Sequence, residues 1–174
     1  LEFRRVLFRS IARFFMDKIN YPPLFEPGLH DMDEAGLKSY CVDCFPSSSR
    51  RGMLYCNFIQ LLESIRELSA QYGCFTEIWV DGSYTTSKPE PDDIDILLVC
   101  DYSNINSIPV MLRGRVDNLL DRNYIKQNYK IDVLLLMKNL DDPNYDYEYW
   151  RSYWRGWFGF DRSENPKGLV RIFL

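Results

Sequence analysis

The sequence predicts an α/β (α+β) domain, in which a small mixed sheet has helices packed on it. Short apolar segments of strand length alternate with longer segments whose apolar residues recur at helical spacing, and no internal repeat is present. A chain of 174 residues is long enough for one domain with one sizeable core.

We expect residues 1–15 to be a non-native leader and residues 16–174 to form a single domain. The opening Leu1–Ser10 reads as a translated cloning scar and not as a targeting signal, so Met16 is the expected native start. Without residues 1–15 the chain loses four arginines and one glutamate, and its formal charge moves from −4 to −7. An acidic domain without a basic stripe is a poor candidate for binding duplex DNA, but it is compatible with a small nucleotide neutralised by metal.

The composition also bears on the membrane and on the redox compartment. No uninterrupted apolar run approaches the roughly 20 residues that a membrane span needs. An odd number of cysteines without a secretory signal argues against a disulfide framework and for a cytoplasmic location. Cys41 and Cys44 form a single C-x-x-C, which is a weak match to a zinc site because two further ligands are required.

The first half of the chain is expected to hold an extended lead-in and two helices. Residues 20–30 are rich in proline and read as extended chain, and a short helix is expected over Asp33–Cys41. A long amphipathic helix follows, capped by the serines Ser47–Ser49 and ended by Gly73. Its apolar residues recur every three or four positions: Met53, Leu54, Phe58, Leu61, Leu62, Ile65 and Leu68.

Four strands are expected beyond that helix, at Glu77–Asp81, Asp93–Cys100, Ile131–Met137 and Gly168–Leu174. Residues 107–128 have helical spacing, and the aromatic segment Tyr145–Phe160 is expected to contain a helix. In the last strand, Val170, Ile172 and Leu174 share an apolar face that is expected to point to the core. The helices are expected to pack on one side of the sheet.

Three aspartates lie within or at the start of two of these strands. Asp93 and Asp95 alternate with isoleucines, so their carboxylates are expected to project from the same face of the sheet. Asp132 lies between two branched apolar residues of another strand. Burying carboxylates side by side is costly unless a cation or a proton offsets their repulsion, so a divalent metal is expected here. The alternative is that these acids only cap turns at exposed strand ends.

A loop rich in small and polar residues leads into the first two of these acids. At its start, Gly82 would let a phosphate approach the backbone and Ser83 would supply a hydroxyl donor. Taken alone the pair would be an ordinary turn, but beside the acids phosphate binding is the favoured interpretation. Lys88 either contacts phosphate or is a solvated loop lysine.

Gly82-Ser83, Asp93-Ile-Asp95 and Asp132 resemble the motif of the nucleotidyltransferase superfamily, whose fold is that of DNA polymerase beta. This motif covers Trp79 to Met137. From Tyr21 to Leu174 the chain is also similar to a little-characterised family of small bacterial nucleotidyltransferase-like proteins. The stretches that carry this second resemblance are Pro22–Phe25, Pro27–His30, Asp81–Lys88, Asp93–Asp95 and Pro166–Arg171.

The resemblance implies a metal-dependent nucleotidyltransferase that moves a nucleoside monophosphate from an NTP to a hydroxyl acceptor. Asp93 and Asp95 would bridge two Mg²⁺ (or Mn²⁺) ions, and Asp132 would complete the site of the ion that activates the attacking hydroxyl. Gly82, Ser83 and Lys88 would hold the phosphates. The acceptor, whether protein, RNA, nucleotide or small molecule, is not identified by the sequence.

Two departures from the superfamily pattern keep a second function open. Pro89 and Pro91 indicate that the helix that usually follows the Gly-Ser pair is short or absent here. No second domain for binding an acceptor or a base is apparent. The alternative is a catalytically silent antitoxin or regulatory module that binds a protein, such as a toxin–antitoxin partner. The aromatic segment Tyr145–Phe158 either packs on the sheet, which we favour, or stacks on a nucleobase or single strand.

Overall fold

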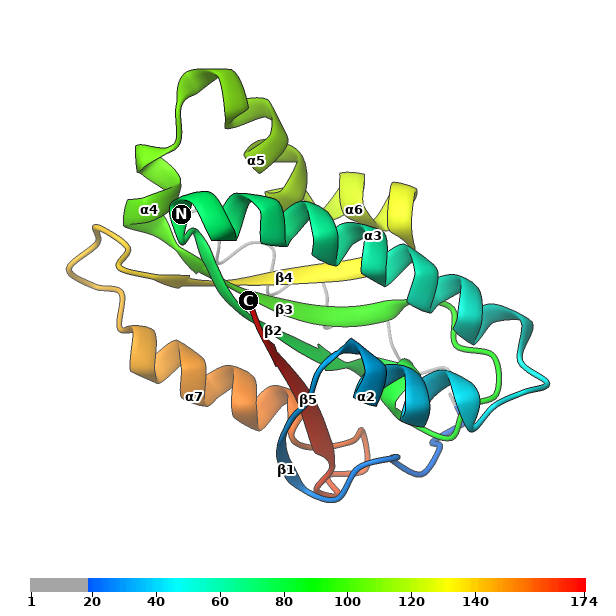
Figure 1. The fold of residues 1–174 in the computed structure, drawn as a ribbon. Helices are drawn as coiled ribbons and strands as arrows, with labels where there is room; N and C mark the ends of the chain where they lie inside the picture. The colour runs from blue at the N-terminus through cyan, green and yellow to red at the C-terminus, as the bar shows by residue number, and fades with distance from the viewer. Residues whose placement is uncertain (1–18) are drawn as a thin grey trace.

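The computed structural model describes residues 19–174, so the expected leader and Met16 lie outside the described residues (Figure 1). The strands are β1 (Gly28–Asp31), β2 (Phe75–Asp81), β3 (Ile94–Asp101), β4 (Ile131–Lys138) and β5 (Gly168–Phe173). The helices are α2 (Glu34–Lys38), α3 (Ser49–Tyr72), α4 (Tyr102–Ser107), α5 (Arg113–Leu120), α6 (Arg122–Tyr129) and α7 (Tyr147–Phe158). Shorter helical turns are η2 (Ser39–Asp43), η3 (Gly82–Thr85) and η4 (Val110–Leu112).

The strands form one mixed sheet in the order β1-β5-β2-β3-β4. The central strand β2 runs antiparallel to both of its neighbours, β3 and β5. The outer pairs, β3 with β4 and β1 with β5, are parallel. The predicted fold class, a small mixed sheet with helices packed on it, is confirmed.

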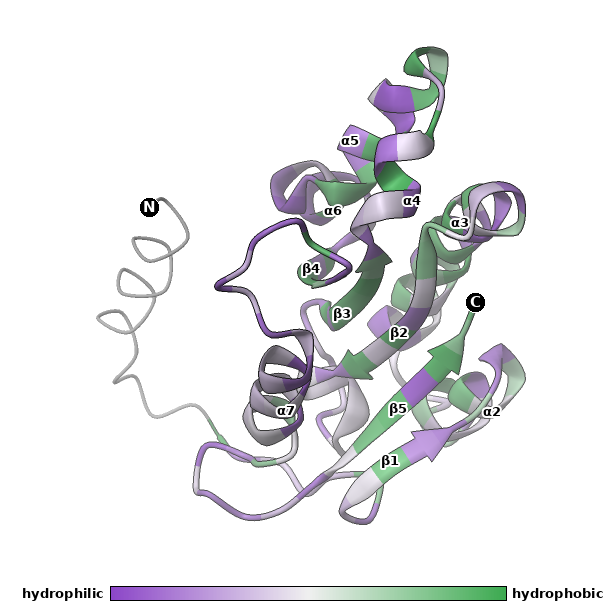
Figure 2. Ribbon diagram, turned by 90° about the vertical axis from the view of Figure 1, so that its left-hand side faces the viewer, coloured by the Kyte–Doolittle hydropathy of each residue, from purple (hydrophilic) through white to green (hydrophobic). Residues whose placement is uncertain are grey.

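Helices cover both faces of the sheet, so the expectation of helices on one side is wrong. The larger core lies under α2–α6, and a smaller cluster lies under α7 on the opposite face. Figure 2 shows α7 and α3 on opposite sides of the strands. The physical reason is that the central strands are apolar on both faces: Trp79 and Leu97 pack in the smaller cluster, whereas their neighbours Val80 and Ile96 pack in the larger one.

The predicted long helix is confirmed as α3, with both of its expected ends. The Ser48 hydroxyl accepts a hydrogen bond from the Arg51 backbone N–H (3.2 Å), and Gly73 closes the helix in the left-handed conformation (φ 63°). Six of the seven predicted apolar positions are buried, whereas Met53 is 48% exposed.

Some predicted boundaries are corrected. The helical pattern of residues 107–128 is divided into α5 and α6 because Asp121 is extended and caps α6, accepting hydrogen bonds from the backbone N–H groups of Asn123 and Tyr124. The third strand begins at Ile94, so Asp93 lies just outside it. In β5, Val170 and Ile172 point to the larger core as expected.

The cysteines bear on the expectation about disulfides, and the helices bear on the expectation about a membrane span. All five cysteines are free thiols, and the Cys44 thiol donates to the Ser39 carbonyl (3.3 Å). Among residues 19–174, no helix has the length and apolar composition needed to cross a bilayer.

The loop between β2 and β3 is held against α3 by a buried arginine. Arg51 is fully buried, and its guanidinium donates hydrogen bonds to backbone carbonyl groups and stacks on Phe45, 3.8 Å from the ring centroid. The carbonyl acceptors belong to Cys41, Tyr84, Thr86 and Lys88. Three of these four lie in the loop, so Arg51 fixes a segment that has no regular structure beyond η3. That η3 is a single short turn confirms the prediction from Pro89 and Pro91.

The Glu90 side chain connects the same loop to the start of α3. Its carboxylate accepts hydrogen bonds from the backbone N–H groups of Ser49 (2.9 Å) and Arg50 (3.0 Å), and from the Ser48 hydroxyl (3.2 Å). These N–H groups belong to the first turn of the helix, which leaves donors unpaired unless a cap supplies acceptors. The loop and the helix therefore stabilise each other.

We predict that Arg51→Met lowers the free energy of unfolding by about 3 kcal/mol or more, because several buried carbonyl groups lose their donor. Arg50→Met is the matched control: Arg50 is exposed and pairs with Asp92 at the surface, so its loss is expected to cost less than about 1 kcal/mol. Urea unfolding of both variants measures the difference. Equal stability of the two variants would contradict the role given to Arg51.

Candidate functional site

Three carboxylates from adjacent strands stand side by side at one end of the sheet. The strand register pairs Asp81 of β2 with Asp95 of β3, and Asp95 with Asp132 of β4. We call these three residues the acid row. The residues beside them in each strand, Val80, Ile96 and Val133, pack in the larger core, so the acid row projects from the opposite face, on which α7 lies.

Asp93 lies just before β3 and on the same side as the acid row. The ammonium of Lys126 on α6 is 3.2 Å from a carboxylate oxygen of Asp93 and 2.7 Å from one of Asp132. One cation thus joins Asp93 to the end of the acid row. The structure therefore brings together Asp93, Asp95 and Asp132, as the sequence predicts.

Asp95, in the middle of the acid row, is the one of the three whose carboxylate makes no ion pair within residues 19–174. Burial raises its pKa to about 7, and the neighbouring carboxylates of Asp93, Asp81 and Asp132 add to the effect. In the described part of the chain no side chain or backbone group donates a hydrogen bond to its carboxylate, although Lys126 acts to lower its pKa from a distance. A proton or a cation at Asp95 would remove this electrostatic penalty.

Asp132, at the β4 end of the acid row, is in contrast well neutralised. Arg122 donates two hydrogen bonds to its carboxylate (2.5 and 3.0 Å), and Lys126 donates a third (2.7 Å). Burial raises the pKa of Asp132, but the hydrogen bonds from Arg122 and then Lys126 outweigh it, so the pKa lies below its ordinary value. Both cations come from α6, which crosses β4 at this end.

Asp81, at the β2 end, is neutralised by a lysine that directly precedes the last strand. The ammonium of Lys167 is 2.7 and 2.9 Å from the two carboxylate oxygens of Asp81, and both residues are buried. Burial holds the pKa of Asp81 above its ordinary value, although the charge of Lys167 acts in the opposite direction. Sequence reasoning did not single out Asp81 as a site residue. The signal that could have found it is its place directly before Gly82, at the end of an apolar strand.

Gly82 lies against Asp95 so closely that no other residue fits. A Cβ atom at this position would be 1.7 Å from a carboxylate oxygen of Asp95, and φ is +77°, a conformation that favours glycine. The first residue of the predicted phosphate loop and the middle of the acid row are thus in direct contact.

The other two predicted phosphate-binding residues, Ser83 and Lys88, differ in whether their side chains are available to a ligand. The Ser83 side chain is half-buried, and its hydroxyl makes no hydrogen bond within residues 19–174, so it is available to a ligand. The ammonium of Lys88 instead pairs with Asp92 (2.8 Å), which also pairs with Arg50. The structure does not bring Lys88 to the acid row.

The acids fit a cation by charge, but they do not form a ready-made cage. Among residues 19–174, no three His, Cys, Asp or Glu side chains converge closely enough to hold a metal ion. The contacts of Asp132 give the reason, because its carboxylate is turned to Arg122 and Lys126. The donor set consists of carboxylates, which suit hard ions such as Mg²⁺ or Mn²⁺, and Asp95 has an unbalanced charge that such an ion would offset.

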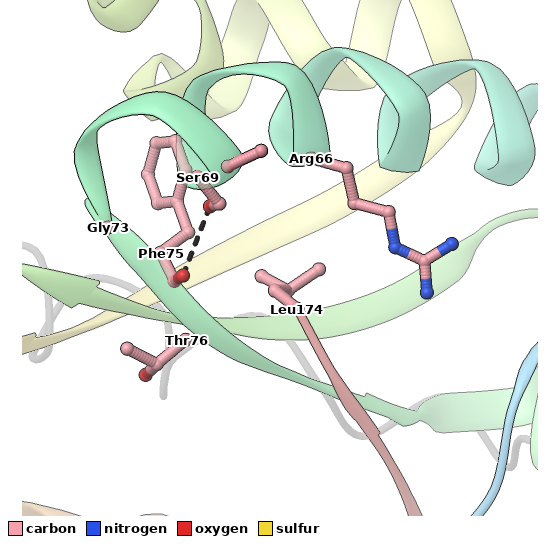
Figure 3. Close-up of a pocket in the computed structure, with 7 residues that line it drawn as sticks. Arg66, Ser69, Gly73, Phe75, Thr76 and Leu174 are labelled. Atoms are coloured by element: carbon pink, nitrogen blue, oxygen red, sulfur yellow. Dashed lines mark hydrogen bonds between the residues drawn. The ribbon is translucent and has the colours of Figure 1, made fainter.

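A separate hollow lies at the other end of β2, away from the acid row (Figure 3). Its volume is about 510 Å³, and it is lined by the end of α3, the start of β2 and Leu174. Two of its polar side chains are already paired: the Ser69 hydroxyl donates to the Phe75 carbonyl (3.0 Å), and Arg66 pairs with Glu34. Thr76 is the other polar side chain of the lining.

The chain belongs to the family of unknown function DUF6932, whose model matches residues 18–173. Comparison with curated proteins gave no match, and comparison with solved structures gave none either.

We predict that Gly82→Ala lowers the free energy of unfolding by about 2–4 kcal/mol, because the added Cβ would collide with Asp95 and the backbone conformation would be strained. Gly156→Ala is the control, since a Cβ atom added at this position of α7 would meet nothing within 4 Å. That variant is expected to be as stable as the wild type or slightly more so. The account of Gly82 is wrong if chemical denaturation finds both variants equally stable.

The raised pKa of Asp95 predicts how stability depends on pH when chelator has removed all metal. The folded state holds the Asp95 proton up to a pKa of about 7, whereas the unfolded state loses it near 3.8. The contribution of this group is therefore fully present below pH 4 and is lost as the pH rises to about 7. Asp95→Asn cannot titrate, so we expect it to exceed the wild type in stability by roughly 2–4 kcal/mol at pH 8 and by little at pH 4. A difference between the two proteins that is constant from pH 4 to pH 8 would contradict this.

Proposed function

We propose that the protein is a metal-dependent nucleotidyltransferase, which moves a nucleoside monophosphate from an NTP to a hydroxyl acceptor. The observation that carries this proposal is the contact between Gly82 and Asp95 inside a row of carboxylates. At this contact a loop that can admit a phosphate chain meets a carboxylate whose charge a cation would offset. An NTP with its metal ion supplies both the phosphate chain and the cation.

Different residues would bind the metal ion and the phosphates. Asp93, Asp95 and Asp132 would hold Mg²⁺ or Mn²⁺. The metal supplies charge neutralisation of the triphosphate and a lower pKa for the attacking hydroxyl. The Ser83 hydroxyl and the backbone at Gly82 would bind the β- and γ-phosphates. Lys88 has a smaller part in this proposal than in the sequence-based one, because Asp92 engages it.

The reaction that fits this arrangement is an in-line displacement at the α-phosphorus. The acceptor oxygen forms a bond to that phosphorus, the bond from phosphorus to the bridging oxygen breaks, and pyrophosphate leaves with that oxygen. The hydroxyl proton passes to solvent. Lys126 and Arg122, which neutralise Asp132, would become available to the phosphates if a metal ion bound to that acid.

A second candidate function is supported by these same two cations. Lys126 and Arg122 balance the charges of Asp93 and Asp132, as expected for a catalytically silent nucleotidyltransferase-like antitoxin or regulatory module. Such a module would act by binding a protein partner. The unbalanced charge of Asp95 favours the enzyme over this alternative.

We predict that the purified protein with Mg²⁺ or Mn²⁺ converts a labelled NTP to a labelled product and pyrophosphate, and that Asp95→Asn lowers the rate at least about 100-fold by removing a metal ligand. Asp92→Asn is the matched control, because Asp92 is exposed and bonded to Lys88 and Arg50 away from the acid row. Its rate is expected to stay within about twofold of the wild type.

The outcomes of this assay separate the two candidate functions. If wild type and Asp95→Asn are equally inactive with all NTPs and dNTPs, the enzyme is rejected. Recovery of a stoichiometric protein partner, whose binding survives Asp93→Ala and Asp95→Ala together, would then select the regulatory module.

A further inference from the structure

Helix α7 carries aromatic side chains on two of its faces, and only one face is needed for the core. Tyr147, Trp150, Trp154 and Phe158 pack against the smaller cluster on the sheet. A second set, spaced by four residues, consists of Tyr149, Tyr153 and Trp157. In this set Tyr149 is 61% exposed and Trp157 is 60% exposed. Packing therefore explains the first set, as the sequence predicts, and leaves the second without a role.

Two members of the second set, Tyr153 and Trp157, form an aromatic surface. The rings of Tyr153 and Trp157 are stacked, with centroids 6.1 Å apart and planes 19° apart. Trp150 meets Tyr153 edge-on at 5.4 Å and so links this surface to the core. Tyr153 and Trp157 are thus oriented by their neighbours although they face outward.

This surface lies on the side of α7 that is turned to β3 and β4. Arg151, on the other side of the helix, pairs with Glu77 of β2 (2.9 Å) and stands over the ring of Trp79. Glu77 is also 3.9 Å from the guanidinium of Arg171 on β5, so Arg151 marks the flank of α7 that is turned to β5. Tyr153 is about 200° around the helix from Arg151, on the opposite flank, and the strands beyond β2 in that direction are β3 and β4. These are the strands that carry Asp95 and Asp132.

The end of α7 that carries Trp157 also lies at the acid end of the sheet. The Lys167 backbone N–H donates to the carbonyl of Gly159, just beyond α7 (2.8 Å), and the Lys167 ammonium binds Asp81 (2.7 Å). Two residues therefore connect the last turn of the helix to the acid row.

We propose that Tyr153 and Trp157 form the wall on which the nucleobase of the bound NTP stacks. The inference rests on the proposed function, because the triphosphate at Gly82 and Ser83 is what places the base. A neutral, flat base suits two stacked rings, and stacking accepts any base. A nucleic acid strand is a poorer occupant, since the whole chain has a formal charge of −4. The base-binding wall would then lie in the same domain as the acid row.

The test compares two probes by calorimetry in Mg²⁺: a non-hydrolysable NTP analogue and inorganic tripolyphosphate, which has no base. We expect the wild type to bind the NTP analogue about 10-fold more tightly than tripolyphosphate. Trp157→Ala is expected to abolish this preference and to leave tripolyphosphate binding unchanged. Phe173→Ala, which removes an aromatic residue of similar exposure (55%) at the far end of β5, is expected to retain it.

Each other outcome has a distinct meaning. If Trp157→Ala and Tyr153→Ala keep the preference, or if the wild type has none, the stacking wall is overturned while the phosphate site stands. If the wild type binds neither probe, the proposed function fails and this inference fails with it.

Discussion

The alignment of three aspartates across β2, β3 and β4 is the constraint on which the rest of the site depends. Antiparallel pairing of β2 with β3 and parallel pairing of β3 with β4 place Asp81, Asp95 and Asp132 in one row. Carboxylates at this spacing repel one another, and partial burial removes the water that would screen them. The ion pairs around the acid row offset that repulsion.

The three aspartates of the acid row differ in the cations that neutralise them. Lys167 neutralises Asp81 from the β5 side, and Arg122 and Lys126 neutralise Asp132 from α6. Within residues 19–174 the middle position, Asp95, has no such partner, and its pKa is raised to about 7. A fold that needed only to bury these acids safely would serve better with a neutral residue at Asp95. A carboxylate at this position is what the proposed cation-binding function would require.

The loop that contacts Asp95 is held in place by α3. Arg51 binds the loop carbonyl groups, and Glu90 caps the helix in return. These contacts hold the loop, which contains two prolines and only the short turn η3, so that Gly82 lies against Asp95. A rigid scaffold under an irregular loop is a common arrangement for binding sites.

The sequence predicted the parts of the fold that local patterns determine. The serine cap and the glycine end of α3 were identified, because both are local signals, and so was the grouping of Asp93, Asp95 and Asp132, because strand alternation fixes their direction. Local patterns could not show that α7 covers the second face of the sheet. They also could not show that Lys167 reaches Asp81, 86 positions away in the chain. Such contacts depend on strand order, which periodicity does not specify.

A crystal structure with Mn²⁺ and a non-hydrolysable NTP analogue is the most direct test of the central claim, that the acid row is a metal and triphosphate site. The account predicts anomalous density for Mn²⁺ bonded to Asp95 together with Asp93 or Asp132, with Lys126 moved from between those two acids and the triphosphate against Gly82 and Ser83. The account is contradicted if Lys126 still joins Asp93 to Asp132, no Mn²⁺ lies at Asp95, and the nucleotide is bound elsewhere or not at all.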